Sequence, residues 1–234
     1  MIKHLKWVGS GIAHLFYPMH CAGCDNELNG TEKILCLHCM TNLPKTGLHN
    51  KESNIAFQKF IGRVPIENAT SFVYFTKQGL VQHLLHQFKY KGKAEIGIFL
   101  GNVFAEDLEK SGWMRNIDAI VPVPLHVKKE QQRGFNQSRF FAQGIAEICG
   151  KPLWDDVLKR IINTDSQTHK SRAERVENMK DVFECQKPNK IANKHLLLVD
   201  DVLTTGATLE ACALSLLKNN NVKVSIATLA IATD

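Results

Sequence analysis

The chain reads His195-Leu-Leu-Leu-Val-Asp-Asp-Val-Leu-Thr-Thr-Gly-Ala-Thr208 near its C-terminal end. The apolar run from His195 to Val199 predicts a buried strand, and two carboxylates follow it. A turn with hydroxyl groups and a glycine comes next, and the apolar residues from Ala207 to Lys218 predict a helix. Strand, turn and helix in this order are typical of an α/β protein whose ligand lies beyond the carboxyl ends of parallel strands.

The turn carries the groups that bind a phosphate. Backbone N–H groups are expected to point into it, and the start of the helix adds positive potential. Threonine hydroxyls supply further donors, and Gly206 lets the backbone approach a ligand closely. We therefore predict a phosphate-binding loop that comprises Val202, Leu203, Thr204, Thr205, Gly206, Ala207 and Thr208.

Asp200 and Asp201 directly precede this loop. Carboxylates at that position can accept hydrogen bonds from vicinal ribose hydroxyls or help to hold a cation. An apolar strand ending in two acids also fits the Walker B strand of an ATPase, but the sequence lacks the G-x-x-x-x-G-K-[ST] loop which that site needs. A strand-to-helix turn without a ligand is the third interpretation.

Strands and helices also alternate on either side of this stretch. Further strands are predicted at residues 71–75, 117–123 and 222–230, and further helices at 80–88, 96–103 and 136–148, the last ending at Gly150. This alternation predicts an α/β fold in which helices flank a parallel sheet on both faces.

Four cysteines form a separate pattern near the N-terminus. Cys21-x2-Cys24 and Cys36-x2-Cys39 are two knuckles, each able to place two thiolates on one tetrahedral ion. Disulfides are the alternative, but a chain of a reducing compartment favours zinc, and four thiolates would close a structural site. His20 and His38 adjoin the cysteines and are possible substitute ligands.

Length and composition allow one ordinary domain with a small addition. The 234 residues are 44% hydrophobic, carry a formal net charge of +6, and include no apolar run long enough to span a membrane. The first 19 residues lack a small-x-small cleavage site, so we expect no signal peptide and a cytoplasmic protein. We divide the chain into residues 1–45, an amphipathic helix followed by the zinc module, and residues 46–234.

The order and spacing of the motifs resemble those of the ComF family (competence protein F), whose members look like type I phosphoribosyltransferases. The resemblance covers nearly the whole chain. It rests on the four cysteines, Phe88-Lys-Tyr-Lys-Gly92, Val121-Pro-Val-Pro124, Arg133-Gly-Phe-Asn-Gln137, Arg172 with Arg175 and Asn178, and the Asp200-Asp201 loop.

The resemblance implies that the loop, the two aspartates, Lys89 and Arg172 bind 5-phosphoribosyl 1-pyrophosphate with Mg²⁺. Lys128, Lys129 and Arg133 are expected on a mobile polar segment over the carboxyl edge of the sheet, where cations could hold pyrophosphate. We interpret the two lysines as solvated and assign Arg133, with Asp200 and Asp201, to catalysis. Exposed surface arginines are an equal alternative for Arg172 and Arg175.

Two functions follow. The first is a phosphoribosyltransferase that displaces pyrophosphate from the activated ribose with an acceptor that the sequence does not identify. The second is a non-catalytic sugar-phosphate-binding adaptor for single-stranded DNA import, since the resemblance implies a part in natural competence. Direct DNA binding is the weaker expectation, because aromatic residues that could stack on bases are sparse in the basic part of the chain.

Overall fold

The computed structural model of the protein describes residues 19–161 and 182–233. The helix expected before Pro18, and also Arg172, Arg175 and Asn178, lie outside the described residues. Among the helices of the described part, none combines the length and apolar character that crossing a bilayer requires.

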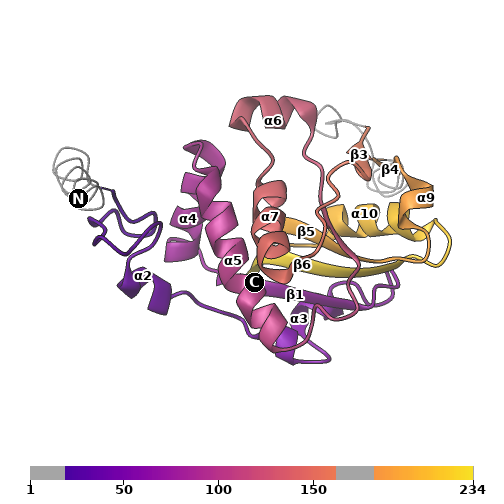
Figure 1. Ribbon diagram of the computed structural model, residues 1–234, viewed down its shortest axis with the longest axis horizontal. Coiled ribbons are helices and arrows are strands. Elements are labelled where there is room, and N and C mark those ends of the chain that lie inside the picture. Colours follow the sequence, from indigo (N-terminus) through magenta and orange to yellow (C-terminus); the bar gives the residue numbers. More distant parts are fainter. Residues whose placement is uncertain (1–18, 162–181, 234) are drawn as a thin grey trace, which may run out of the picture.

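A four-stranded parallel sheet forms the centre of the molecule (Figure 1). Its strands, in spatial order, are β1 (Asn68–Phe75), β6 (Lys223–Ala232), β5 (His195–Leu203) and β2 (Ala119–Pro122). In β5, Leu197 and Val199 pack into one hydrophobic cluster, while Leu196 and Leu198 pack into another. Neighbouring strands of this sheet pair in parallel and both of its faces are buried, which confirms the predicted parallel sheet.

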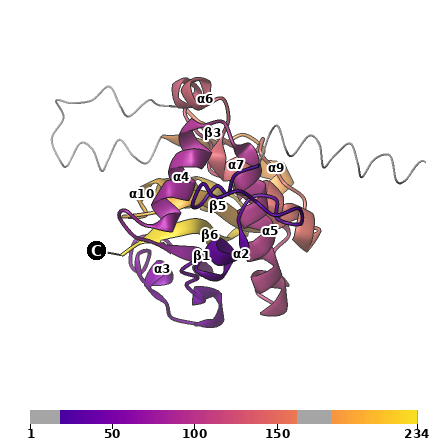
Figure 2. The same cartoon turned by 90° about the vertical axis from the view of Figure 1, so that its left-hand side faces the viewer.

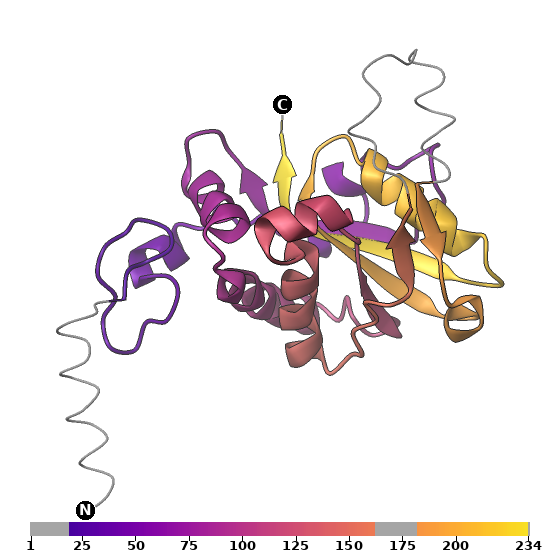
Figure 3. The ribbon, with the colours of Figure 1, turned by 90° about the horizontal axis from the view of Figure 1, so that it is seen from above.

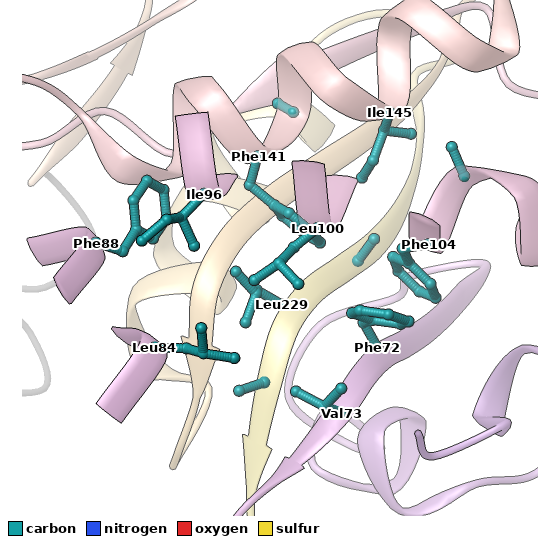
Figure 4. Packing of buried hydrophobic residues seen from close by; sticks show 14 of the residues in the cluster. Phe72, Val73, Leu84, Phe88, Ile96, Leu100, Phe104, Phe141, Ile145 and Leu229 are labelled. Carbon is teal, nitrogen blue, oxygen red and sulfur yellow. The ribbon is translucent and has the colours of Figure 1, made fainter. Parts of the chain in front are cut away.

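Helices cover the two faces of this sheet, with α7 and α10 on opposite sides (Figure 3). One cluster holds α4 (Leu80–Tyr90), α5 (Ala94–Lys110) and α7 (Gln137–Cys149), and the other holds α10 (Ala207–Leu217) with α9 (Pro188–Ile191) and the short α3 (Ile55–Gln58). In the first cluster, one side chain from each of these helices, Leu84, Leu100 and Phe141, lies near Leu229 of β6, and Phe104 packs on Phe72 of β1 (Figure 4).

Several short elements differ from the sequence expectation. Residues 128–133, expected as a mobile polar segment, belong to the helix α6 (Val127–Arg133), which begins where the His126 ring accepts from the Lys128 N–H and ends at Gly134. The remaining elements are α2 (Leu37–Thr41), the 3-10 helix η1 (Leu48–Asn50), and an antiparallel pair, β3 (Leu158–Arg160) with β4 (Phe183–Cys185).

The cysteine-bearing segment packs on α4. Cys21, Leu28, Leu35 and Cys39 belong to the same buried cluster as the α4 residues Val81 and Leu84. In Figure 2, which looks onto this segment, it lies in front of α4 and α5. The helix α4 therefore lies between the cysteine segment and the rest of the molecule.

Candidate functional site

The predicted phosphate loop joins the carboxyl end of β5 to the start of α10. A pocket of about 50 Å³ opens there, lined by Asp200, Val202 and residues 204–209. Thr204, Thr205 and Thr208 are exposed, whereas Leu203 is buried. The loop thus presents hydroxyl and backbone groups around a small concavity, and the side chains of Val202 and Leu203 anchor it in the core.

Gly206 fixes the shape of the loop. Its φ of 80° lies in the left-handed region, and a Cβ atom there would come within 3.0 Å of the buried Phe60 ring. The loop therefore passes too close to Phe60 for a larger residue to fit without a shift.

Arg63 braces the same loop from outside. Its guanidinium donates to the carbonyl of Thr205 at 2.7 Å and to that of Lys59 at 2.9 Å, and it pairs with the carboxylate of Glu210 in the first turn of α10. Because Arg63 neutralises Glu210, it also limits the repulsion that this carboxylate would exert on a bound phosphate. Arg63 was not among the predicted site residues, since no local pattern links it to residues far along the chain.

Asp200 is held in place by a residue of α7. Its Oδ1 accepts from Ser138 Oγ at 2.7 Å and from the Asp201 N–H at 2.9 Å. Ser138 itself is buried and lies in the first turn of α7, where Asn136 accepts from its N–H and donates to the Val123 carbonyl. Burial, and next the charge of Asp201, raise the pKa of Asp200 to about 7. Ser138 was not among the predicted site residues.

Asp201 forms an ion pair with Lys89. The ammonium Nζ lies 2.5 Å from Asp201 Oδ2, and the two side chains are only 21% and 17% exposed. Lys89 belongs to the last turn of α4, and its side chain reaches Asp201 of β5. Three of the predicted site residues, Lys89, Asp200 and Asp201, are therefore neighbours in the structure.

Arg133 lies next to this group of residues through two contacts. Its Nη1 donates to Gln137 Oε1 at 3.0 Å, and its guanidinium lies 5.8 Å from the centre of the Tyr90 ring. Gln137 directly precedes Ser138, the partner of Asp200, and Tyr90 directly follows Lys89, the partner of Asp201. Arg133 therefore contacts the sequence neighbours of both partners. Within the part of the chain that the structure describes, no hydrogen bond or ion pair joins Arg133 directly to Asp200 or Asp201.

The four cysteines form a second candidate site, with ligand sulfurs all within 4.8 Å of one another. The sulfurs of Cys24 and Cys36 are 3.7 Å apart, close to the roughly 3.8 Å that a tetrahedral ion with zinc–sulfur bonds of about 2.3 Å requires, and far beyond a disulfide bond. Among the described residues, His20 and His38 are not part of this cluster.

Backbone N–H groups favour the thiolate form of one of these ligands. Burial alone raises the pKa of Cys21, but donors that include the Cys36 and Gly23 N–H groups, each 3.3 Å from its sulfur, lower it to about 7. A thiolate is the form that binds a metal ion. Because four cysteine sulfurs lie within 4.8 Å of one another, the cluster fits a closed, structural metal site.

Comparisons with known proteins identify relatives of the part of the chain that carries the loop and the two aspartates. A model of the phosphoribosyl transferase domain matches residues 136–233. The chain is 30% identical to the DNA utilization protein YhgH of Escherichia coli K12 over 209 residues, which is 88% of this chain and 87% of that protein. It is 28% identical to competence protein F of Haemophilus influenzae, over 83% of this chain and 89% of that protein. A YhgH of Salmonella typhimurium is 32% identical over 61% of this chain, and that match spans 63% of the Salmonella protein.

Proposed function

Because the chain belongs to the ComF family of proteins with a phosphoribosyltransferase fold, we propose that it binds 5-phosphoribosyl 1-pyrophosphate with Mg²⁺ and transfers the phosphoribosyl group. The observation that carries this proposal is the pair Asp200 and Asp201, which lies between the phosphate loop and Lys89. The loop can thus bind the phosphate, and the two adjacent carboxylates can bind the ribose hydroxyls or help to hold the cation.

Each residue has a distinct role in the proposed binding mode. The loop from Val202 to Thr208 binds the 5′-phosphate, and Asp200 and Asp201 accept hydrogen bonds from the ribose hydroxyls. Arg133 binds the pyrophosphate, and the two lysines of α6, Lys128 and Lys129, stay outside the site. Arg172, which lies outside the described residues, remains a proposed phosphate ligand. A bound Mg²⁺ would offset the negative charge of the pyrophosphate.

The proposed reaction breaks the bond between the anomeric carbon and the pyrophosphate oxygen, and the electron pair leaves with the pyrophosphate. A nucleophile of the acceptor forms the new bond to the same carbon. Positive charge develops on the ribose while negative charge grows on the leaving group, so positioned charges can accelerate the step without a side-chain nucleophile. Asp200 and Asp201 face the first of these charges and Arg133 the second.

Release of pyrophosphate from the activated ribose tests this proposal, screened over amines and nucleobases. We expect release with at least one acceptor and little release by the Asp200→Asn, Asp201→Asn double variant. Binding of the activated ribose without release with any acceptor would favour the second candidate, a non-catalytic sugar-phosphate-binding adaptor. The names of the relatives, competence protein F and DNA utilization protein, support a role of either candidate in DNA uptake, with DNA-uptake proteins or single-stranded DNA as partners.

We further propose that Cys21, Cys24, Cys36 and Cys39 hold one structural zinc ion. The close approach of their sulfurs supports it. The division into a zinc module of residues 1–45 and a catalytic domain of residues 46–234, and a cytoplasmic location, are also part of the proposal.

A further inference from the structure

We propose that Lys89 is an exchangeable counter-ion of Asp201: its ammonium group keeps free divalent cations off the carboxylates, and arrival of the cation-bound sugar phosphate displaces it toward the pyrophosphate. This inference rests on the proposed function and describes how the same site is regulated.

The contacts of the two aspartates differ in kind. Asp200 is fixed by hydrogen bonds from the Ser138 hydroxyl of α7 and from the Asp201 N–H of β5. Asp201 instead pairs with a long, flexible side chain: the ammonium of Lys89 lies 2.5 Å from its Oδ2. A carboxylate that pairs with a lysine in this way can exchange that partner for another cation without a change in the backbone.

The ammonium lies 2.5 Å from Asp201 Oδ2, so a divalent cation that bound this oxygen would have to compete with it. Both side chains are largely enclosed, with 21% and 17% exposure, so a free cation would have to lose water and displace Lys89 at once. A cation that arrives on a phosphorylated sugar brings negative charge with it, and this charge can accept the displaced ammonium. The pair therefore favours binding of cation and sugar phosphate together.

The end of α4 that carries Lys89 also lies close to a second cation, Arg133. Tyr90, the next residue, is 65% exposed, and Arg133 lies over its ring. Lys89 and Arg133 thus stand at the same end of α4, where the proposed function places the pyrophosphate. A lysine has three donors and no acceptor, so it suits either Asp201 or a pyrophosphate oxygen, one at a time.

The test measures Mn²⁺ binding to the zinc-loaded protein alone, by electron paramagnetic resonance of free Mn²⁺. Lys89→Met is expected to bind Mn²⁺ about tenfold more tightly than the wild type, because the carboxylates lose their competing cation. Lys91→Met is the matched control: it removes the same charge from an exposed residue next to Tyr90 and should leave Mn²⁺ affinity unchanged. Adding Asp201→Asn to Lys89→Met should abolish the gain.

Calorimetry with 5-phosphoribosyl 1-pyrophosphate and Mg²⁺ provides the second arm, in which Lys89→Met should lose about tenfold in affinity. Lys89→Gln repeats both arms with a polar side chain, in case the methionine disturbs the fold. Unchanged Mn²⁺ affinity in both Lys89 variants would overturn the proposal and mark the ion pair as a fixed contact, even if the wild type binds the activated ribose. A wild type that fails to bind the activated ribose, beside variants that gain Mn²⁺ affinity, would instead refute the proposed function and retain Lys89 as the competing counter-ion.

Discussion

At Asp200, burial and hydrogen bonding act in opposite directions on one carboxyl group. Burial and the neighbouring Asp201 favour the protonated form, whereas Ser138, the backbone and Lys89 favour the charged form. Burial and the Asp201 charge outweigh the contacts that favour the charged form, so the pKa of Asp200 is raised to about 7. Asp200 therefore lies where we expect a ribose, but its ionised carboxylate destabilises the folded protein.

This destabilisation predicts a pH dependence. The folded-state pKa of Asp200 lies above its ordinary value of 3.8, so the folded state binds the proton more tightly and stability falls as pH rises from about 4 to about 7. Asp200→Asn should flatten this decline and leave the variant more stable than the wild type at pH 8, by roughly 1 kcal/mol or more. Urea denaturation at pH 5 and pH 8 measures both effects.

The matched control for this experiment is Asp156→Asn. Lys187 and Lys190 lower the pKa of the exposed Asp156 carboxyl, so its replacement should not stabilise the protein at pH 8. Identical pH profiles for Asp200→Asn and the wild type would show that the raised pKa is wrong.

At the scale of single elements, the sequence predicted the long strands and helices around the site but not the short pieces that support it. The helix predicted at 136–148 was found as α7 because the apolar periodicity and the C-cap at Gly150 agree along one stretch of chain. The short α3 has no such pattern; it begins where Asn54 accepts from the Ala56 and Phe57 N–H groups and donates to the Ala69 carbonyl in β1. Contacts between distant residues, which a local pattern does not contain, fix these pieces.

Arg63, which follows α3 in the chain, contacts the phosphate loop, and its role there can be tested by substitution. Arg63→Ala removes the donor to the Thr205 carbonyl and leaves Glu210 unpaired near the loop. We expect faster hydrogen exchange at residues 203–210 and weaker binding of inorganic phosphate, by about fivefold, since a lost hydrogen bond costs about 1 kcal/mol. Arg139→Ala, which breaks an exposed pair with Asp155, is the control and should change neither quantity. Equal exchange rates in both variants would contradict the bracing role.

The cysteine segment is a second element whose role can be tested separately. The purified protein should contain about one zinc ion per chain by elemental analysis, and Cys36→Ser should lose it and become more sensitive to proteolysis between residues 19 and 45. Cys185→Ser, which lies outside the cluster, should keep both the zinc and the resistance. Zinc far below one ion per chain in protein purified without chelator, with titratable free thiols, would refute the zinc site.

For the whole molecule, the parallel sheet is what assembles the site from distant segments. Ser138 and Asp200 are 62 residues apart in sequence, and Arg63 and Thr205 are 142 apart, yet each pair is in hydrogen-bonding contact. The sequence predicted the loop and the aspartates because these are contiguous at one strand end. It predicted Lys89 only through the family resemblance, and it missed Ser138 and Arg63, whose roles depend on how the sheet and helices pack.

Calorimetry in the presence of Mg²⁺ shows whether this edge of the sheet binds 5-phosphoribosyl 1-pyrophosphate. We predict binding by the wild type and a loss of tenfold or more in the Asp200→Asn, Asp201→Asn variant, because each charge-assisted hydrogen bond contributes about 1.5 to 3 kcal/mol. Inorganic phosphate should be affected less, since its predicted ligands are in the loop. A wild type that gives no heat with the activated ribose but binds ATP would contradict this prediction and favour the ATPase.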